Sequence, residues 1–236
     1  MAPAAADPTR ISVIVPALDE AARLPLTLAV LQGLRQRGHE VILVDGGSGD
    51  ATVAVSRPLV DTMLQAARGR AVQMRAGADA ASGDIFWFLH ADTRVPEHAD
   101  RLINEALRDT STQWGHFEVQ LSEHRFSLQL VATLMNIRSR LSGIATGDQG
   151  IFVRRTLYTT VGGIPPLPLM EDIALSRTLK RHGRPAVIRQ RLRSSPRRWE
   201  EHGVIRTMLL MWGLRLAYFA GVSPGRLARL YQPHQP

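Results

Sequence analysis

The sequence predicts a single nucleotide-binding α/β domain with a mixed, mainly parallel sheet and a C-terminal helical extension. Three short apolar runs support this fold class, at residues 11–15, 41–44 and 85–89, and turn-forming residues bound each run. Runs of four or five aliphatic residues, many of them β-branched, are typical of parallel strands that are buried on both faces. A helical pattern separates the first two runs, which predicts a strand–helix–strand unit with a right-handed crossover.

Each of the three runs ends in acidic residues. Glu20 lies just after the first run, Asp45 follows the second and Asp92 follows the third. In an open α/β sheet, ligands bind outside the carboxyl ends of the strands. Carboxylates gathered there are costly unless they meet a cation or a polyhydroxylated ligand. The pattern therefore predicts an enzyme that handles a nucleotide and a metal.

Composition sets the scale of the fold and the kind of metal site it can hold. The chain has 236 residues, 44% of them hydrophobic, which suits one large domain. It contains no cysteine, so a metal must bind oxygen or imidazole ligands. Residues 1–9 lack the basic and apolar segments of a signal peptide and are predicted to form a disordered tail. We expect the main domain at residues 10–200 and the helical extension at 201–236.

The chain is strongly basic, with a formal net charge of +8 and a pI near 11.1. Many of its basic residues lie between positions 177 and 198. Nucleic-acid binding is one explanation, but no nucleic-acid motif or interleaved stacking aromatics accompany them. A solvated face explains the charge equally well, as does a surface that faces anionic lipid or a diphosphate substrate.

The remaining pattern predicts the other elements in order. After Pro25, leucines at helical spacing predict a helix that Gly38 closes. Strict alternation at residues 114–121 predicts a half-exposed strand. We expect further helices at residues 51–56, 69–81, 96–107, 126–141 and 171–181, a short strand at 150–153, and a Gly/Pro loop at 162–169.

Residues 204–222 form an apolar segment that nearly reaches membrane-spanning length. Two arginines and two glycines within it argue against a transmembrane helix. Two alternatives remain, a helix packed against the core and an amphipathic helix that lies on a membrane, where Trp212 and Tyr218 would suit the interface.

Five short motifs occur in the order found in family 2 glycosyltransferases. They are Val-Pro-Ala-Leu-Asp-Glu at 15–20, Val-Asp-Gly-Gly-Ser-Gly-Asp-Ala-Thr at 44–52, His-Ala-Asp at 90–92, Glu-Asp at 171–172 and Arg-Arg-Trp at 197–199. The chain resembles this family over about residues 10–200, and residues 199–224 resemble a small bacterial branch often encoded beside radical-SAM proteins. The resemblance implies the GT-A fold and transfer, with inversion, of a sugar from a nucleotide diphosphate donor to an acceptor hydroxyl.

The resemblance implies a set of donor-binding residues: Pro16, Ala17, Glu20, Asp45, Arg70, Ala91 and Arg198. Asp45 could accept hydrogen bonds from a base edge or a ribose hydroxyl, although a turn-capping role is the alternative. Arg70 could donate to the diphosphate or lie on a surface helix. The family usually has Asn where this chain has Arg75. Asp50 is better explained as a helix cap than as a ligand contact.

The metal is expected on Asp92, the carboxylate that remains in the His-Ala-Asp motif. Mg²⁺ or Mn²⁺ would take other ligands from the diphosphate and water, so its binding should be weak without nucleotide. His90 could join as a ligand or form a hydrogen bond nearby, and we favour the hydrogen bond.

Catalysis is expected at Glu171 and Asp172. The resemblance implies that Asp172 removes the acceptor proton and that Glu171 orients it, whereas the structural alternative is two acids at the positive end of a helix. Gln149 and Trp199 are expected at the acceptor, and Asp148 could line the same side. Arginines of the Arg-Arg-Trp motif would offset leaving-group charge.

Two other functions are compatible with parts of the pattern. A nucleotidyltransferase on a similar fold would need a Gly-rich basic loop after the first strand, which residues 16–20 lack. A non-enzymatic basic protein that binds nucleic acid or membrane would leave the acidic strand ends unexplained. For the favoured enzyme we expect a nucleotide diphosphate-sugar, an unknown acceptor and an anionic membrane surface as partners, and no nucleic acid. We expect it in the cytoplasm, including the cytoplasmic face of the membrane.

Overall fold

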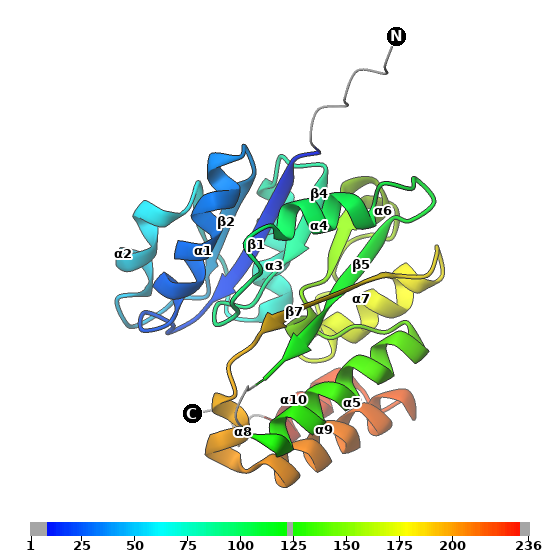
Figure 1. The fold of residues 1–236 in the computed structure, drawn as a ribbon. Coiled ribbons are helices and arrows are strands. Elements are labelled where there is room, and N and C mark those ends of the chain that lie inside the picture. Colours follow the sequence, from blue (N-terminus) through cyan, green and yellow to red (C-terminus); the bar gives the residue numbers. More distant parts are fainter. Residues whose placement is uncertain (1–8, 122–124, 232–236) are drawn as a thin grey trace.

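The computed structural model describes residues 9–121 and 125–231, and the predicted tail therefore falls almost wholly outside them. One seven-stranded sheet runs through the molecule in the order β3-β2-β1-β4-β6-β5-β7 (Figure 1). Its strands are β1 (Ile11–Ala17), β2 (Glu40–Asp45), β3 (Thr62–Gln65), β4 (Ile85–Phe88), β5 (Trp114–Gln120), β6 (Phe152–Arg154) and β7 (Ala186–Arg193). Only β6 is antiparallel to its neighbours, so the predicted mixed, mainly parallel sheet is confirmed.

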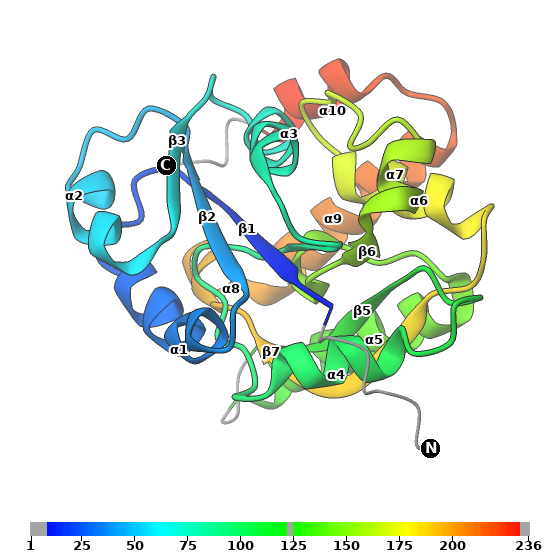
Figure 2. The ribbon, with the colours of Figure 1, turned by 90° about the horizontal axis from the view of Figure 1, so that it is seen from above.

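Helices cover both faces of this sheet (Figure 2). They are α1 (Leu24–Gln36), α2 (Thr52–Ser56), α3 (Arg70–Ala80), α4 (Ala99–Ala106), α5 (Phe126–Ser142), α6 (Arg155–Thr160), α7 (Glu171–Lys180), α8 (Arg197–His202), α9 (Val204–Phe219) and α10 (Pro224–Tyr231). Two short 3₁₀ turns, Arg57–Leu59 and Gly147–Gln149, complete the elements. The helix expected after Pro25 is confirmed as α1.

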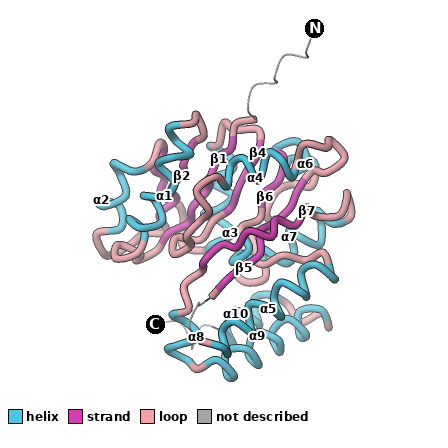
Figure 3. The backbone as a smooth tube through the Cα atoms, in the orientation of Figure 1, coloured by secondary structure: helices cyan, strands magenta, loops and turns pink. Residues whose placement is uncertain are grey.

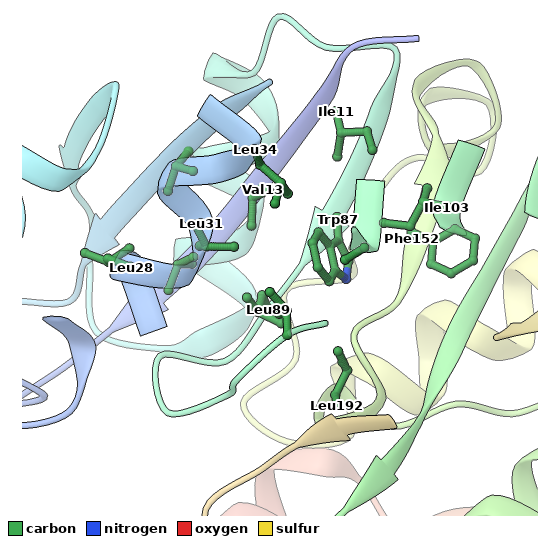
Figure 4. Close-up of a cluster of buried hydrophobic side chains, with 14 of the residues drawn as sticks. Ile11, Val13, Leu28, Leu31, Leu34, Trp87, Leu89, Ile103, Phe152 and Leu192 are labelled. Atoms are coloured by element: carbon green, nitrogen blue, oxygen red, sulfur yellow. The ribbon is translucent and has the colours of Figure 1, made fainter. Parts of the chain in front are cut away.

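Alternate residues of β1 point to opposite faces of the sheet and pack into two separate hydrophobic cores. Val13 and Val15 pack with the leucines of α1 and with Trp87 on one face (Figure 4). Ile14 packs with α3 on the other face, where a Cβ on Gly77 would lie 2.5 Å from the Ile14 side chain. Glycine at position 77 therefore lets α3 approach the sheet closely.

The parallel register brings the acidic strand ends together. Ala17, the last residue of β1, is paired with Asp45 at the end of β2, and β4 lies on the other side of β1. The loops that follow β1, β2 and β4 thus open at one edge of the sheet, as the sequence predicts.

The second half departs from the sequence expectation in two strands. The strand predicted at residues 114–121 is not half exposed. Six of the seven residues of β5 are buried, because α5 covers one side and the core the other. β7 was not predicted, because arginines interrupt its apolar residues. It is the last strand of the sheet, and exposed arginines on an edge strand discourage pairing with another chain.

The C-terminal helices α8 to α10 lie together with α5 at the lower end of the molecule in Figures 1 and 3. On one side, α9 packs against a cluster formed by β5 and α5 and against a second cluster that includes α7 and α10. One face of α9 is therefore packed against the core, as the first alternative predicts, while its other face is exposed. Among the described residues, no helix combines the length and apolar character needed to cross a bilayer.

Candidate active site

The turn after β2 is organised around the Asp45 carboxylate. Asp45 is 3% exposed and accepts hydrogen bonds from the backbone N–H groups of Gly47 and Ser48, at 2.9 and 3.1 Å, and from the Ser48 hydroxyl. The turn-capping role considered for Asp45 is therefore present. It leaves room for a ligand contact as well, since a carboxylate offers about four lone-pair sites.

Gln73, which was not predicted from the sequence, joins the ends of β1 and β2. Its side-chain nitrogen Nε2 donates to the carbonyl oxygens of Ala17 at 2.8 Å and Val44 at 2.9 Å. A Cβ on Gly46 would lie 3.0 Å from the same nitrogen, so glycine there makes room for the bridge. The available signal was a polar residue on the buried face of a small-residue helix.

Glu20 lies in the loop after β1, next to Asp92 and Arg197. Burial raises the pKa of the Glu20 carboxyl, the nearby charge of Asp92 raises it further, and Arg197 opposes both. The Arg197 Nη2 atom is 3.3 Å from Glu20 Oε1, so residues 177 positions apart meet here. Pro16 and Ala17 precede this loop, and buried Ala17 offers mainly its backbone.

A pocket of about 380 Å³ opens beside Asp92. Its lining comes from α1, the loop after β4, the end of β5 and the segment between β7 and α8: Arg23, Leu26, Thr27, Asp92, Arg94, Gln120, Leu121, Arg193, Ser194, Ser195 and Pro196. Three of these residues are arginines. Guanidinium groups around one carboxylate suit a ligand with several phosphate oxygens.

The residues at Asp92 fit a hard divalent cation that keeps much of its own shell. Within residues 9–121 and 125–231, no three His, Asp or Glu residues are grouped so that they could hold a metal. Asp92 would supply one carboxylate, with Glu20 within electrostatic reach. Mg²⁺ is commonly bound by one or two carboxylates together with substrate phosphates. The site therefore fits a metal that binds together with a nucleotide.

Asp172 lies in the first turn of α7, and two features fix its direction. The Gly147 backbone N–H donates to Asp172 Oδ2 at 2.7 Å. Met170, which precedes the helix, has a left-handed conformation with φ of 66°, uncommon for a non-glycine residue. Packing of buried Met170 with Leu214 of α9 and Leu227 of α10 holds it there. The C-terminal helices thus set the start of α7.

Glu171 is 5% exposed and lies 3.7 Å from Arg70, measured from Oε1 to Nη1. Burial raises the pKa of Glu171, the adjacent Asp172 raises it further, and Arg70 and His90 oppose the rise. Glu171, Asp172, Arg70, His90 and Gly147 line one small pocket. The structure therefore brings the residues predicted on α3 and α7 together.

Arg70 interacts electrostatically with several of the predicted acidic residues. Burial lowers the pKa of its guanidinium, but the charges of Glu171, Asp172, Asp148 and Asp92 outweigh this effect and raise it. The Arg70 side chain is 45% exposed, so it also remains open to a ligand. Arg70 links the edge that carries Asp92 with the helix that carries Asp172.

His90 is held by Asp148 in the loop before β6. Its Nδ1 atom is 3.2 Å from Asp148 Oδ1, and the Ser194 hydroxyl donates to the same oxygen at 3.2 Å. The other ring nitrogen has no partner among the described residues, and a Cβ on Gly147 would lie 2.4 Å from it. This geometry favours the hydrogen-bonding alternative for His90.

Two arginines that the sequence analysis missed lie near the acids. Burial and the charge of Arg215 lower the pKa of Arg138 on α5 to about 10, while Asp172 and Asp148 oppose the decrease. Burial also lowers the pKa of Arg215 on α9, and the same two carboxylates oppose it. The acids around Asp172 therefore face cations from two helices that are distant in sequence.

Gln149 does not face the site. It is fully buried, and its Oε1 accepts the Thr146 backbone N–H at 3.2 Å while its Nε2 donates to the Ser139 hydroxyl at 2.9 Å. These bonds cap the 3₁₀ turn that presents Asp148. In this conformation Gln149 supports the loop, and its side chain is not available to an acceptor.

Other predicted residues have more peripheral positions. Trp199 is partly buried against the cluster of β5 and α5. Ala91 is 6% exposed, and its carbonyl oxygen accepts the Thr27 hydroxyl at 2.8 Å. Arg75 is exposed, as expected of a surface helix residue. The side chain of Arg198 lies outside the described part of the structure.

Asp50 lies one residue before the N-cap of α2, because the helix begins at Thr52 and not at Ala51 as expected. Its Oδ1 atom accepts the Thr52 backbone N–H at 2.9 Å, and its Oδ2 accepts the Ala21 N–H at 3.1 Å. Asp50 therefore supports the start of α2 and the loop after β1, but the N-cap itself is Ala51 and not Asp50 as predicted.

Comparison with known proteins identifies the family. The profile described as glycosyl transferase family 2 matches residues 12–152. An undecaprenyl-phosphate 4-deoxy-4-formamido-L-arabinose transferase of Aeromonas hydrophila is 33% identical over 111 residues, which cover 42% of this chain and 34% of that protein. A protein of the same name from Pseudomonas fluorescens is 28% identical over 64% of this chain and 48% of its own length. The chain thus spans about a third to a half of these curated relatives.

Solved structures share the fold at lower identity. Staphylococcus aureus TarS 1-349 in complex with UDP superposes with a TM-score of 0.64 at 16% identity, over 79% of this chain and 60% of that one. Glucosyl-3-phosphoglycerate synthase from Mycobacterium tuberculosis, in complex with Mn²⁺, UDP and glucosyl-3-phosphoglycerate, gives 0.58 at 22% identity, over 78% and 70%. The predicted GT-A fold is confirmed. With the family profile covering more than half of its residues, the chain belongs to glycosyl transferase family 2.

Proposed function

We propose that this glycosyltransferase moves a sugar from a nucleotide diphosphate donor to an acceptor hydroxyl with inversion at the anomeric carbon. One observation supports this most strongly. Arg70 lies within electrostatic reach of Asp92, on the strand-end edge, and of Glu171 and Asp172, at the start of α7. An arrangement with a nucleotide edge on one side and, on the other, buried Glu171 beside half-buried Asp172 suits direct displacement between two substrates.

The donor would occupy the edge formed by the loops after β1, β2 and β4. Asp45 would accept hydrogen bonds from the base or ribose, and the backbone of Pro16 and Ala17 would lie beneath the nucleoside. Ala91 would contribute backbone contacts, and Glu20 would lie beside the nucleotide. Arg70 and Arg198 would offset the charge of the diphosphate.

Asp92 would hold the metal together with the diphosphate and water, and Mg²⁺ or Mn²⁺ is the expected ion. When bound, such an ion neutralises charge that develops on the departing diphosphate. Solved proteins of similar fold support this expectation, since Pyrobaculum calidifontis mannosyltransferase PcManGT was determined with GDP-Man and Mn²⁺ at 21% identity and a TM-score of 0.59.

Asp172 would accept the proton of the acceptor hydroxyl. As the hydroxyl oxygen bonds to the anomeric carbon, the bond between that carbon and the diphosphate oxygen breaks and its electron pair leaves with the diphosphate. The proton passes to an Asp172 oxygen, which Gly147 holds in place. Glu171, with Arg70 beside it, would orient this step, and Asp148 and Trp199 would border the acceptor, behind which Gln149 supports the loop.

The acceptor and cellular setting are further parts of the proposal. The Aeromonas and Pseudomonas relatives are named for transfer to undecaprenyl phosphate. Their names support an acceptor that is a membrane lipid. A peripheral position on the cytoplasmic face of the membrane is part of the same proposal.

A panel of UDP-, GDP-, ADP- and CDP-sugars in a thermal-shift assay tests the donor assignment. We expect one base to stabilise the protein in the presence of Mn²⁺, and we expect the shift to disappear with EDTA or in Asp92→Asn. Asp79→Asn, at an exposed position on α3, is the matched control and should keep the full shift. Undiminished binding in EDTA would remove Asp92 as a metal ligand. Pyrophosphate exchange with a nucleoside triphosphate would instead support the nucleotidyltransferase alternative.

A further inference from the structure

Two neighbouring helices of the structure expose continuous apolar stripes to solvent. Along α5 the exposed residues recur every three or four positions, and the same spacing occurs along α9. The stripe of α5 contains Phe126, Leu130, Leu134, Ile137 and Leu141, and that of α9 contains Ile205, Leu209, Trp212, Leu216 and Phe219. Single exposed apolar residues are ordinary, but ten on two adjacent helices mark an interaction surface.

The opposite faces of both helices are already packed. Leu128, Val131 and Met135 of α5 join β5 in a buried cluster, against which Met208 of α9 also packs. Leu214 of α9 belongs to the cluster that contains Met170. The helices therefore do not need their outer faces for the fold. Figure 1 shows α5 and α9 side by side at the lower end of the molecule, so we call their outer stripes the α5–α9 face.

The charge of this region indicates what covers it. The helices α5, α9 and α10 contain six arginines, two in each helix, and no aspartate or glutamate. Arg206, Arg226 and Arg229 are exposed to solvent. The other three have acidic partners inside the molecule, since Arg138 and Arg215 act on Asp172 and Arg140 pairs with Glu118. A second copy of the chain would bring the same positive charge to the interface. An anionic bilayer accepts apolar side chains and attracts basic residues near its surface.

We propose that the α5–α9 face lies in the headgroup region of an anionic membrane. The inference deepens the membrane association proposed above by assigning it to two helices, one of which, α5, carried no such expectation from its sequence. It rests on the exposed surface and its charge, independently of the transfer chemistry.

The α5–α9 face is also coupled to the proposed catalytic helix. Through Leu214, α9 packs against Met170 and Ile173, which flank Glu171 and Asp172. The next residue of α9, Arg215, acts electrostatically on Asp172. A membrane below this face would therefore lie on the side of the molecule that supports Asp172.

Vesicle flotation with the full chain tests the assignment. Wild type should float with vesicles of phosphatidylcholine and phosphatidylglycerol at low salt, and much less with phosphatidylcholine alone. Leu130→Gln combined with Leu209→Gln should lower the partition coefficient about tenfold or more, because two half-exposed leucines no longer bury apolar surface. Leu26→Gln, at a leucine of similar exposure on α1, should leave flotation unchanged.

Separate readouts distinguish this inference from the transferase proposal. The double variant should keep the wild-type melting temperature and the nucleotide-sugar thermal shift. Wild type that stays with the unbound fraction at low salt would overturn the membrane assignment, as would a double variant that floats like wild type. A concentration-dependent dimer that the double variant abolishes would assign the face to a second copy, and would also overturn it.

Discussion

The two halves of the molecule hold their proposed site residues in different ways. In residues 9–107, which we call the donor half, Asp45 ends β2 and Asp92 lies in the loop after β4. These two strands flank β1, and the register of one sheet places both residues. In residues 113–231, the acceptor half, Asp172 depends on Gly147 and on packing of Met170 against α9 and α10. The first arrangement follows from local patterns, whereas the second needs contacts between elements far apart in sequence.

The two halves also have different proposed tasks, which are donor binding in the donor half and proton acceptance during transfer in the acceptor half. In the donor half, the sheet itself holds Asp45 and the loop that carries Asp92. The acceptor half offers groups whose direction depends on the C-terminal helices, which also expose the α5–α9 face. We therefore expect substitutions in the donor half to affect donor binding or global stability, and substitutions in the acceptor half to affect transfer.

The largest expected effect is on transfer by Asp172→Asn. Asn keeps the size of the side chain but cannot accept the acceptor proton, and general-base contributions are about 10²–10⁴-fold. We expect single-turnover transfer to fall by that order at saturating substrates. Asp148→Asn is the matched control and should retain substantially more transfer. Near wild-type transfer by Asp172→Asn would move the base to Glu171 or Asp148.

Gly77→Ala should destabilise the donor half. The added Cβ would lie 2.5 Å from the Ile14 side chain and 3.1 Å from that of Val44, so α3 must move away from the sheet. Overpacking of this kind costs about 1–3 kcal/mol, which urea denaturation can measure. Gly213→Ala on α9, where a Cβ meets nothing within 4 Å, should not destabilise. Equal losses in both variants would contradict the close-packing explanation.

Glu171→Gln tests the buried acid of the acceptor half through pH. Burial raises the folded-state pKa of Glu171 above its ordinary 4.5. The protonated side chain therefore contributes fully to folding stability below pH 4.5, and this contribution is lost as the pH rises through the folded-state pKa. The free energy of unfolding of Glu171→Gln, relative to wild type, should therefore increase as the pH rises above about 4.5. A difference that does not vary with pH would show that Glu171 titrates normally.

Site residues of the donor half could be predicted from the sequence more fully than those of the acceptor half. Pro16 and Asp45 follow apolar runs directly and Asp92 lies three residues after one, so the strand pattern and the family motifs both identified them. Arg138 and Arg215 carry no local signal, because each is one of two arginines in a largely apolar helix and acquires its role only when α5 and α9 pack beside Asp172.

The sequence also could not show which way each side chain in a loop points. Asp148 and Gln149 are adjacent, and only the capped 3₁₀ turn shows that Asp148 reaches His90 while Gln149 is buried. β7 was missed for a similar reason, since its alternating arginines read as a solvated segment until its pairing with β5 is known.

Equilibrium donor binding in two variants tests the division of the site most directly. Asp45→Asn and Asp172→Asn remove the same charge from opposite halves, and both should be titrated with the donor that the panel identifies, at saturating Mn²⁺. Loss of a hydrogen bond to a charged group costs roughly 1.5–3 kcal/mol, so Asp45→Asn should weaken donor binding by about 10- to 150-fold. Asp172→Asn should bind the donor like wild type. Equal weakening in both variants, or weakening confined to Asp172→Asn, would contradict the account.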